Sequence, residues 1–148
     1  MSQKFQIIHT VSQNVLDQNV RWNMPYVPAI KVLQGKPVYI SGVNAAPVYH
    51  EHPHKPKEFD HLDFGAENQA KLTMENLGDI LKTAGGAFSD VVQIFVFIVN
   101  IQKNAECIGR VVSSYFGNHL PTSTVIGIAD LVTDSRLILE ITAVAYIG

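Results

Sequence analysis

A single carboxylate interrupts the apolar run near the C-terminus. Residues 137–147 read LILEITAVAYI, and this β-branched, apolar composition predicts a strand. Alternate residues of a strand share one face, so Glu140 would lie beside Ile138 and Thr142 in apolar surroundings. Buried glutamates are rare. Glu140 is therefore either a strand-end residue that reaches solvent or a backbone N–H, or a group held in place for chemistry.

Three histidines alternate in the segment VYHEHPHKPKEFDH, residues 48–61. In an extended backbone His50, His52 and His54 project to one side, and imidazoles spaced in this way can chelate a divalent metal. The competing interpretation is a solvated loop whose prolines break the regular projection. Long loops on compact domains are often functional. We therefore name His52 and His54 as candidates for substrate contact, and we expect no metal and no other cofactor.

Three further positions have side chains or backbone suited to a site. Tyr26 lies between Pro25 and Pro28, which favour an extended, rigid segment, although it could equally be a packing residue. Ser41-Gly42 follows a β-rich run, and a glycine there lets backbone N–H groups approach a ligand, or simply ends the strand. Cys107 is expected to be a packed thiol, because no His–acid pair lies beside it in the sequence.

Composition limits the classes of protein and partner. The chain has 148 residues, enough for one domain, with 47% hydrophobic and only 16% charged residues, which favours subunits that cover one another. The net charge of −2 and the lack of a basic cluster argue against nucleic acid as a partner. One cysteine, no secretory signal and no apolar run long enough to cross a bilayer predict a cytoplasmic protein that does not enter membranes.

Periodicity and turn residues divide the chain into strands and helices. A first strand is expected within 4–11, and a hairpin from 29–33 and 38–41 around a Gly/Pro turn. Helices are expected at 63–84, ended by two glycines, and at 105–118, with Asn104 as the N-cap. Strands at 89–100, 124–131 and 137–147 are apolar on both faces and are expected to be covered on both sides. This order predicts an α+β fold, with two helices on one face of a mixed sheet and another subunit on the other face.

The same residues resemble a known family. The motifs are PVYISG at 37–42, DFGAENQA at 63–70, ENL at 75–77, SDVV at 89–92, Tyr115-Phe116, Pro121 and LEITAVA at 139–145. Together they are similar to the Rid (YjgF, L-PSP) family of reactive enamine and imine deaminases, over about residues 26–146. The resemblance implies a chorismate-mutase-like fold and a homotrimer with ligand sites in the clefts between subunits. It also implies that Tyr26, Ser41 and Gly42 line such a cleft, where Glu140 positions the attacking water.

Two departures from the family pattern bear on the substrate. Active imino-acid deaminases of the family carry an arginine two residues after the proline that corresponds to Pro121, and this chain has Ser123 there. They also often carry an asparagine at the position of Val112. Serine cannot replace the two-pronged grip of arginine on a carboxylate. We therefore expect a substrate without an α-carboxylate, or one held by another group such as Arg21, His52 or His54.

These points together predict a hydrolytic deaminase of an enamine or imine. Glu140 would deliver a proton and orient water, while Ser123, Thr124 and the adjoining Val125 contact the substrate together with backbone N–H groups around Gly42. Three alternatives stay open at this point. They are a non-catalytic trimer that binds a small metabolite, a ribonuclease, and a metalloenzyme that uses the three alternating histidines.

Overall fold

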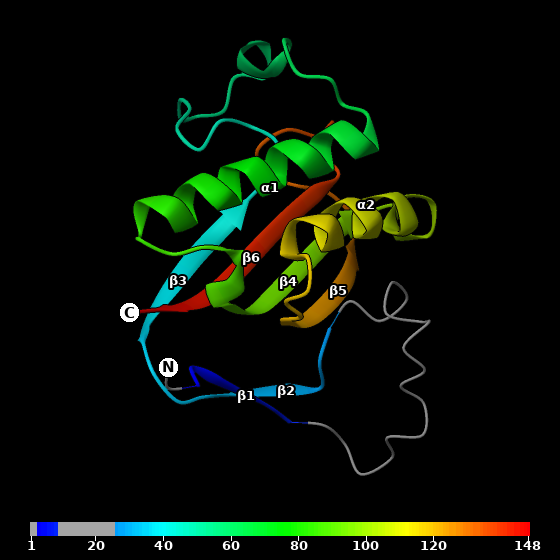
Figure 1. Cartoon of the computed structure of the whole chain (residues 1–148). Helices are drawn as coiled ribbons and strands as arrows, with labels where there is room; N and C mark the ends of the chain where they lie inside the picture. The colour runs from blue at the N-terminus through cyan, green and yellow to red at the C-terminus, as the bar shows by residue number, and fades with distance from the viewer. Residues whose placement is uncertain (1–2, 9–25) are drawn as a thin grey trace.

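The larger sheet of the protein has four strands, and two helices cross one of its faces (Figure 1). The computed structural model describes residues 3–8 and 26–148. The strands are β1 (Phe5–Ile8), β2 (Ala29–Val32), β3 (Lys36–Val43), β4 (Val91–Val99), β5 (Thr122–Ile128) and β6 (Leu139–Ile147). The helices are α1 (Ala66–Thr83) and α2 (Ile101–Phe116), with single 3₁₀ turns at Pro56–Phe59 and Phe88–Asp90. The predicted α+β architecture, with two helices on one face of a mixed sheet, is confirmed.

Strands β4 and β6 form the middle of the sheet, whose order is β3-β6-β4-β5. Both are dominated by β-branched and aromatic residues, and their pairing is antiparallel, whereas β5 lies parallel to β4. Ile94, Val96 and Ile98 are buried against the helices, while Phe95 and Phe97 face the other way and are only half-buried. The inner position predicted for 89–100 is thus confirmed, but within one chain only one side of β4 is fully covered.

The helices occur where the apolar periodicity predicted them, with shifted N-terminal ends. Helix α1 begins at Ala66, three residues later than predicted, and ends at Thr83. Gly85, one of the two glycines expected to end it, follows the C-cap with a φ of +81°, which favours glycine. Helix α2 begins directly after β4, so that Asn100 in a left-handed conformation precedes it, and the N-cap predicted at Asn104 is wrong. Asn104 lies inside the helix, where its amide donates to the Val99 carbonyl at 2.8 Å. Cys107 consequently lies in the second turn and not the first.

The hairpin predicted from 29–33 and 38–41 is not formed, and the last two strands of the chain are not neighbours. Strand β2 pairs with β1, and β3 pairs with β6, so the Gly/Pro turn sends the chain from one sheet into another instead of closing a hairpin. Similarly, β4 lies between β5 and β6. Strand β5 is therefore an edge strand with exposed apolar side chains, and the covering expected on both of its sides is not found in the single chain.

A second, smaller apolar cluster lies under the long loop between β3 and α1. It consists of Ala45, Ala46, Phe59 and Leu137, and Phe59 is completely buried. This cluster attaches the 3₁₀ turn of the loop to the segment that leads into β6. In the part of the chain that the structure describes, no helix combines the length and apolarity needed to cross a lipid bilayer.

Candidate functional site

Strand β6 presents Glu140 on the face of the sheet that the helices leave open. Its neighbours in sequence, Leu139 and Ile141, are completely buried on the helix side, whereas Glu140 is half-buried and shares the open face with Thr142 and Val144. The alternation predicted from the sequence is confirmed. The carboxylate thus stands on a rigid inner strand, at a position where a ligand can reach it from the open side.

A bulge in the neighbouring strand makes room for this carboxylate. The β3–β6 register is regular up to Ile40 and shifts before Val43, so Ser41 and Gly42 lie in the irregular stretch. A Cβ atom added to Gly42 would lie 2.3 Å from Oε1 of Glu140 and 2.6 Å from its Cδ. The carboxylate therefore lies directly against the backbone of Gly42, and only a residue without a side chain permits this approach.

Asn44 holds the other carboxylate oxygen. Its Nδ2 donates to Oε2 of Glu140 at 3.2 Å and lies 3.5 Å from Oγ1 of Thr133. Its Oδ1 accepts from the backbone N–H of Ala46 at 2.9 Å, which fixes the end of the amide that carries the NH₂ group. Asn76 of α1 donates to the carbonyls of both Asn44 and Ala46. These hydrogen bonds hold Asn44 in place, and Asn44 in turn orients the carboxylate of Glu140.

Sequence reasoning missed Asn44 and Thr133. Thr133 lies in the connection between β5 and β6, far from Asn44 in the chain, and no local pattern links it to Glu140. For Asn44 a weak signal exists, because an asparagine that accepts from the N–H two residues later is a common turn former. Its position two residues after Gly42 therefore marks a structured start of the long loop.

Three other predicted residues line a separate cleft. This cleft, of about 650 Å³, lies between the β1–β2 ribbon and the first residues of β5, and Tyr26, Ser123 and Thr124 line it with Tyr39 and Tyr146. The backbone N–H of Val27 donates to the Pro121 carbonyl at 3.2 Å. That bond ties the proline-bounded segment of Tyr26 to the start of β5.

Strand register separates this cleft from Glu140 within one chain. Glu140 shares a row with Phe97 and Ile126, whereas Ser123 shares a row with Ile94, which faces the helices. Two strand spacings, about 10 Å, lie between β6 and β5. One chain therefore brings Glu140 together with Ser41 and Gly42, and Tyr26 together with Ser123 and Thr124, but it does not join the two groups. Val125 lies on the exposed edge strand beside the second group.

None of the arginines in the described residues reaches either group. Arg136 donates to Asp134, to Asp60 and to the Pro56 carbonyl, and its guanidinium lies 4.4 Å from the Phe64 ring centre. Its hydrogen bonds and charge lower the pKa of Asp134, and both acids raise the pKa of Arg136. Arg110 forms an ion pair with Glu106 on the exposed surface of α2. Arg21, the predicted stand-in for the family arginine, lies outside the described residues.

The three histidines lie on the long loop, outside the cleft of Tyr26 and Ser123. None of them lines the cleft of Tyr26 and Ser123, so the expected contact of His52 and His54 with substrate stays a prediction. Instead, His50, His52 and His54 face one another on the long loop, close enough for one ring nitrogen from each to approach a common ion. Among the described residues, these are the side chains placed to hold a metal.

A larger cleft of about 900 Å³ lies between α1 and α2. It is lined by Cys107, Tyr115 and charged side chains such as Lys71 and Glu106, but by none of the predicted site residues. Cys107 is half-buried there, and no thiol-activating histidine lines the cleft with it.

Comparison with known proteins places the fold and the chain. Residues 17–147 match the model of the family described as Endoribonuclease L-PSP. The chain is 31% identical over 124 residues to the human 2-iminobutanoate/2-iminopropanoate deaminase, which covers 84% of this chain and 81% of that protein. It is also 31% identical over 121 residues to a RutC family protein of Saccharolobus solfataricus, covering 82% of this chain and 86% of that one.

A solved structure supports the same fold. A Rid-family protein of unknown function from Yersinia pestis superposes with a TM-score of 0.73 at 20% identity, covering 98% of this chain and all of the other. At that identity the likeness concerns the arrangement of the sheet and its two helices, and it carries no activity with it.

Proposed function

Because this chain belongs to the Endoribonuclease L-PSP family, we propose that it hydrolyses the C=N bond of an imine, or of the imine tautomer of an enamine, and releases ammonia. Relatives that carry the name 2-iminobutanoate/2-iminopropanoate deaminase support deamination at the level of the family. The observation that carries the proposal for this chain is the placement of Glu140. Its carboxylate is fixed between the Gly42 backbone and the Asn44 amide, on the open face of an inner strand.

In the proposed reaction Glu140 serves first as base and then as acid. An enamine first becomes its imine tautomer by gaining a proton at carbon and losing one from nitrogen. The carboxylate accepts a proton from a water molecule while the water oxygen bonds to the C=N carbon, whose π electrons move to nitrogen. Protonated Glu140 then returns this proton to nitrogen, which gives a carbinolamine that carries one hydroxyl and one amino group. Glu140 next accepts the hydroxyl proton and passes it to the amino nitrogen as the C–N bond breaks, so that ammonia leaves and the carbonyl forms. The net change is addition of one water and loss of one ammonia.

The complete site, in this proposal, joins residues from two copies of the chain. Glu140, Ser41 and Gly42 of one copy would meet Tyr26, Thr124 and the backbone of Ser123 of another, across the open face of the sheet in a homotrimer. Exposed apolar side chains on this face support the contact, since Tyr39 is 77% and Ile126 is 40% exposed in the single chain. The register that separates the two groups within one chain supports it as well.

The substrate is proposed to lack an α-carboxylate. Ser123 stands where the related deaminases are expected to carry an arginine, and the described arginines are engaged elsewhere. A carboxylate brought next to Thr124 would find a hydroxyl donor but no guanidinium to offset its loss of hydration. An uncharged or cationic enamine or imine fits this hydroxyl group better.

The test is ammonia release from enamines and imines generated in the assay, with and without an α-carboxylate, by the wild type and by Glu140→Gln. The amide keeps the shape of the side chain but cannot take a proton from water, so we expect at least a hundredfold loss, about what general acid–base catalysis contributes. Glu75→Gln on the exposed side of α1 is the matched control and should keep full turnover. Full turnover by Glu140→Gln would remove the proposed role.

A trimer that binds a small metabolite without converting it is the second candidate. Its support is Ser123 itself, since a site without the expected arginine can lose turnover and keep a pocket. Saturable binding of a panel compound, with no product formed over hours, would select this function. Cleavage of RNA is not favoured, because the net charge of −2 offers little attraction for a polyanion.

A further inference from the structure

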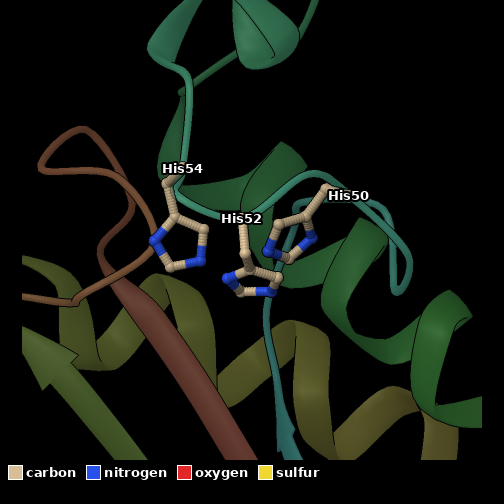
Figure 2. A group of neighbouring side chains, drawn as sticks. All are labelled: His50, His52 and His54. Atoms are coloured by element: carbon tan, nitrogen blue, oxygen red, sulfur yellow. The ribbon is translucent and has the colours of Figure 1, made fainter.

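The long loop between β3 and α1 brings three imidazoles together. His50, His52 and His54 face one another, with ring centres 4.4 to 5.1 Å apart (Figure 2). One ring nitrogen from each lies within 4.8 Å of the other two. We propose that these three side chains form a binding site for a divalent transition-metal ion of the Zn²⁺ class. None of the three ligands hydrogen-bonds to Glu140 in the described residues or lines the cleft of Tyr26 and Ser123.

The spacing is close to that of a three-histidine centre. Zn–N bonds of about 2.0–2.1 Å in a tetrahedral arrangement place the ligand nitrogens about 3.3 Å apart. The largest separation here is 4.8 Å, so the rings need to approach a common centre by roughly 1 Å, a movement within the reach of side-chain rotation. His52 is exposed and His54 is half-buried, so both can make this movement.

His50 is already prepared as a ligand. Its Nδ1 lies 2.8 Å from the carbonyl oxygen of Pro47, and because a carbonyl only accepts, Nδ1 must carry the proton. The lone pair is therefore on Nε2, and that atom is buried without a hydrogen-bond partner. Phe59 contacts the ring edge to face, with centres 5.5 Å apart, and holds its orientation. A metal-bound histidine typically donates its other N–H to a carbonyl in this way.

A bound ion would satisfy a group that is otherwise costly. A buried polar atom without a partner destabilises the folded chain, and it persists where another interaction or a function compensates for it. His52 and His54 cannot satisfy Nε2 of His50 unless their own nitrogens carry protons toward it, whereas one cation accepts lone pairs from all three. The unpartnered atom and the convergence of the rings are thus two separate observations that point to the same ligand.

The donor set selects the class of metal. Three neutral imidazoles suit Zn²⁺, Cu²⁺ and Ni²⁺, whereas Mg²⁺ and Ca²⁺ prefer oxygen ligands. The nearest positive side chain in the sequence, Lys55, is neutralised by an ion pair with Glu51. Three protein ligands leave a fourth position of the tetrahedron for water or for a ligand from outside.

The test uses the full chain without an affinity tag, because a tag of histidines binds the same metals. After treatment with a chelator, ZnCl₂ is titrated calorimetrically into the wild type and into His50→Ala, His52→Ala and His54→Ala. We expect one Zn²⁺ per chain for the wild type and at least a tenfold weaker affinity for each variant. Thermal unfolding followed in parallel should show a Tm that rises with ZnCl₂ in the wild type only.

His61→Ala is the matched control. His61 is an exposed histidine on the same loop but outside the cluster, so its replacement should leave Zn²⁺ affinity and the rise in Tm unchanged. Because His52 is exposed, His52→Ala should fold, and its unfolding without metal should match that of the wild type. Wild-type protein that binds no Zn²⁺, or a His52→Ala variant that binds as tightly as the wild type, would overturn the proposal. MgCl₂ in place of ZnCl₂ should give no heat, and equal binding would also contradict it.

Discussion

Gly42→Ala tests the position of the Glu140 carboxylate most directly. The added Cβ would lie 2.3 Å from Oε1, whereas ordinary contacts begin at 3.4 Å, so the carboxylate must retreat by about 1 Å. Such a shift also strains its 3.2 Å hydrogen bond with Asn44. Misplacement of a catalytic group by this much typically lowers turnover about a hundredfold. We therefore expect ammonia release to fall by that factor.

Stability should respond far less than activity. The atom that the new Cβ meets is the end of a half-buried side chain and can move, and Gly42 does not have a positive φ, so alanine fits its backbone. The loss of chain freedom in the unfolded state partly compensates, and we expect the free energy of unfolding to change by less than about 1 kcal/mol. Ammonia release on the best panel substrate and thermal unfolding measure the two effects separately.

Gly109→Ala is the control for this experiment. Gly109 lies on the exposed side of α2, and a Cβ there would meet nothing within 4 Å. The replacement should stabilise the helix by up to about 1 kcal/mol and leave turnover unchanged. If Gly42→Ala works at the wild-type rate while Glu140→Gln does not, the carboxylate does not act from its position against Gly42, contrary to the proposed mechanism.

Two other predictions concern assembly and acid stability. Ile126→Glu places a charge on the open face in the same row as Glu140, so light scattering should show monomers and ammonia release should vanish. The control Val132→Glu changes a side chain that is 88% exposed and should alter neither. A trimer of Ile126→Glu would contradict the proposed contact. Arg136→Ala removes the cation that lowers the pKa of Asp134 below its ordinary 3.8. The lowered pKa stabilises the folded chain when the pH is above 3.8. This stabilisation is lost as the pH falls through the pKa that Asp134 has in the folded state. The variant should therefore be less stable than the wild type at about pH 7, and the difference in stability should shrink toward about pH 2. A difference in thermal unfolding that does not change with pH would exclude this cause.

Local sequence patterns predicted the helices and strands, but not which strands pair with one another. The apolar stripe of α1 and the β-branched run of β4 are each determined by neighbouring residues, so their periodicity is visible in the sequence. The pairing of β3 with β6 joins segments about a hundred residues apart, and turn signals such as Gly35 carry no information about it. Gly35 has a φ of +99°, which a hairpin and a crossing between sheets can use equally.

In the candidate site, too, features set by neighbouring residues were predictable and features that depend on distant segments were not. Strand alternation alone places Glu140 on one face, and that much was predictable. Its contact with Gly42 depends on a bulge in another strand, and its hydrogen bond to Asn44 depends on the conformation of a loop. The convergence of the three histidines was visible as a spacing, but the preparation of His50 required the Pro47 carbonyl and the packing of Phe59.

The long loop is fastened to the scaffold at two separate points. Asn76 holds its beginning at Asn44 and Ala46, and Arg136 holds its 3₁₀ turn at Pro56 and Asp60. Residues 47–55 therefore span two fixed ends, and lengthening such a span costs only about 0.6 kcal/mol per doubling. In evolutionary terms, residues 47–55 can therefore change in sequence and length while the sheet and helices stay the same. A descendant can replace its histidines by another recognition sequence without refolding the sheet, and a protein engineer can graft a foreign peptide at the same place.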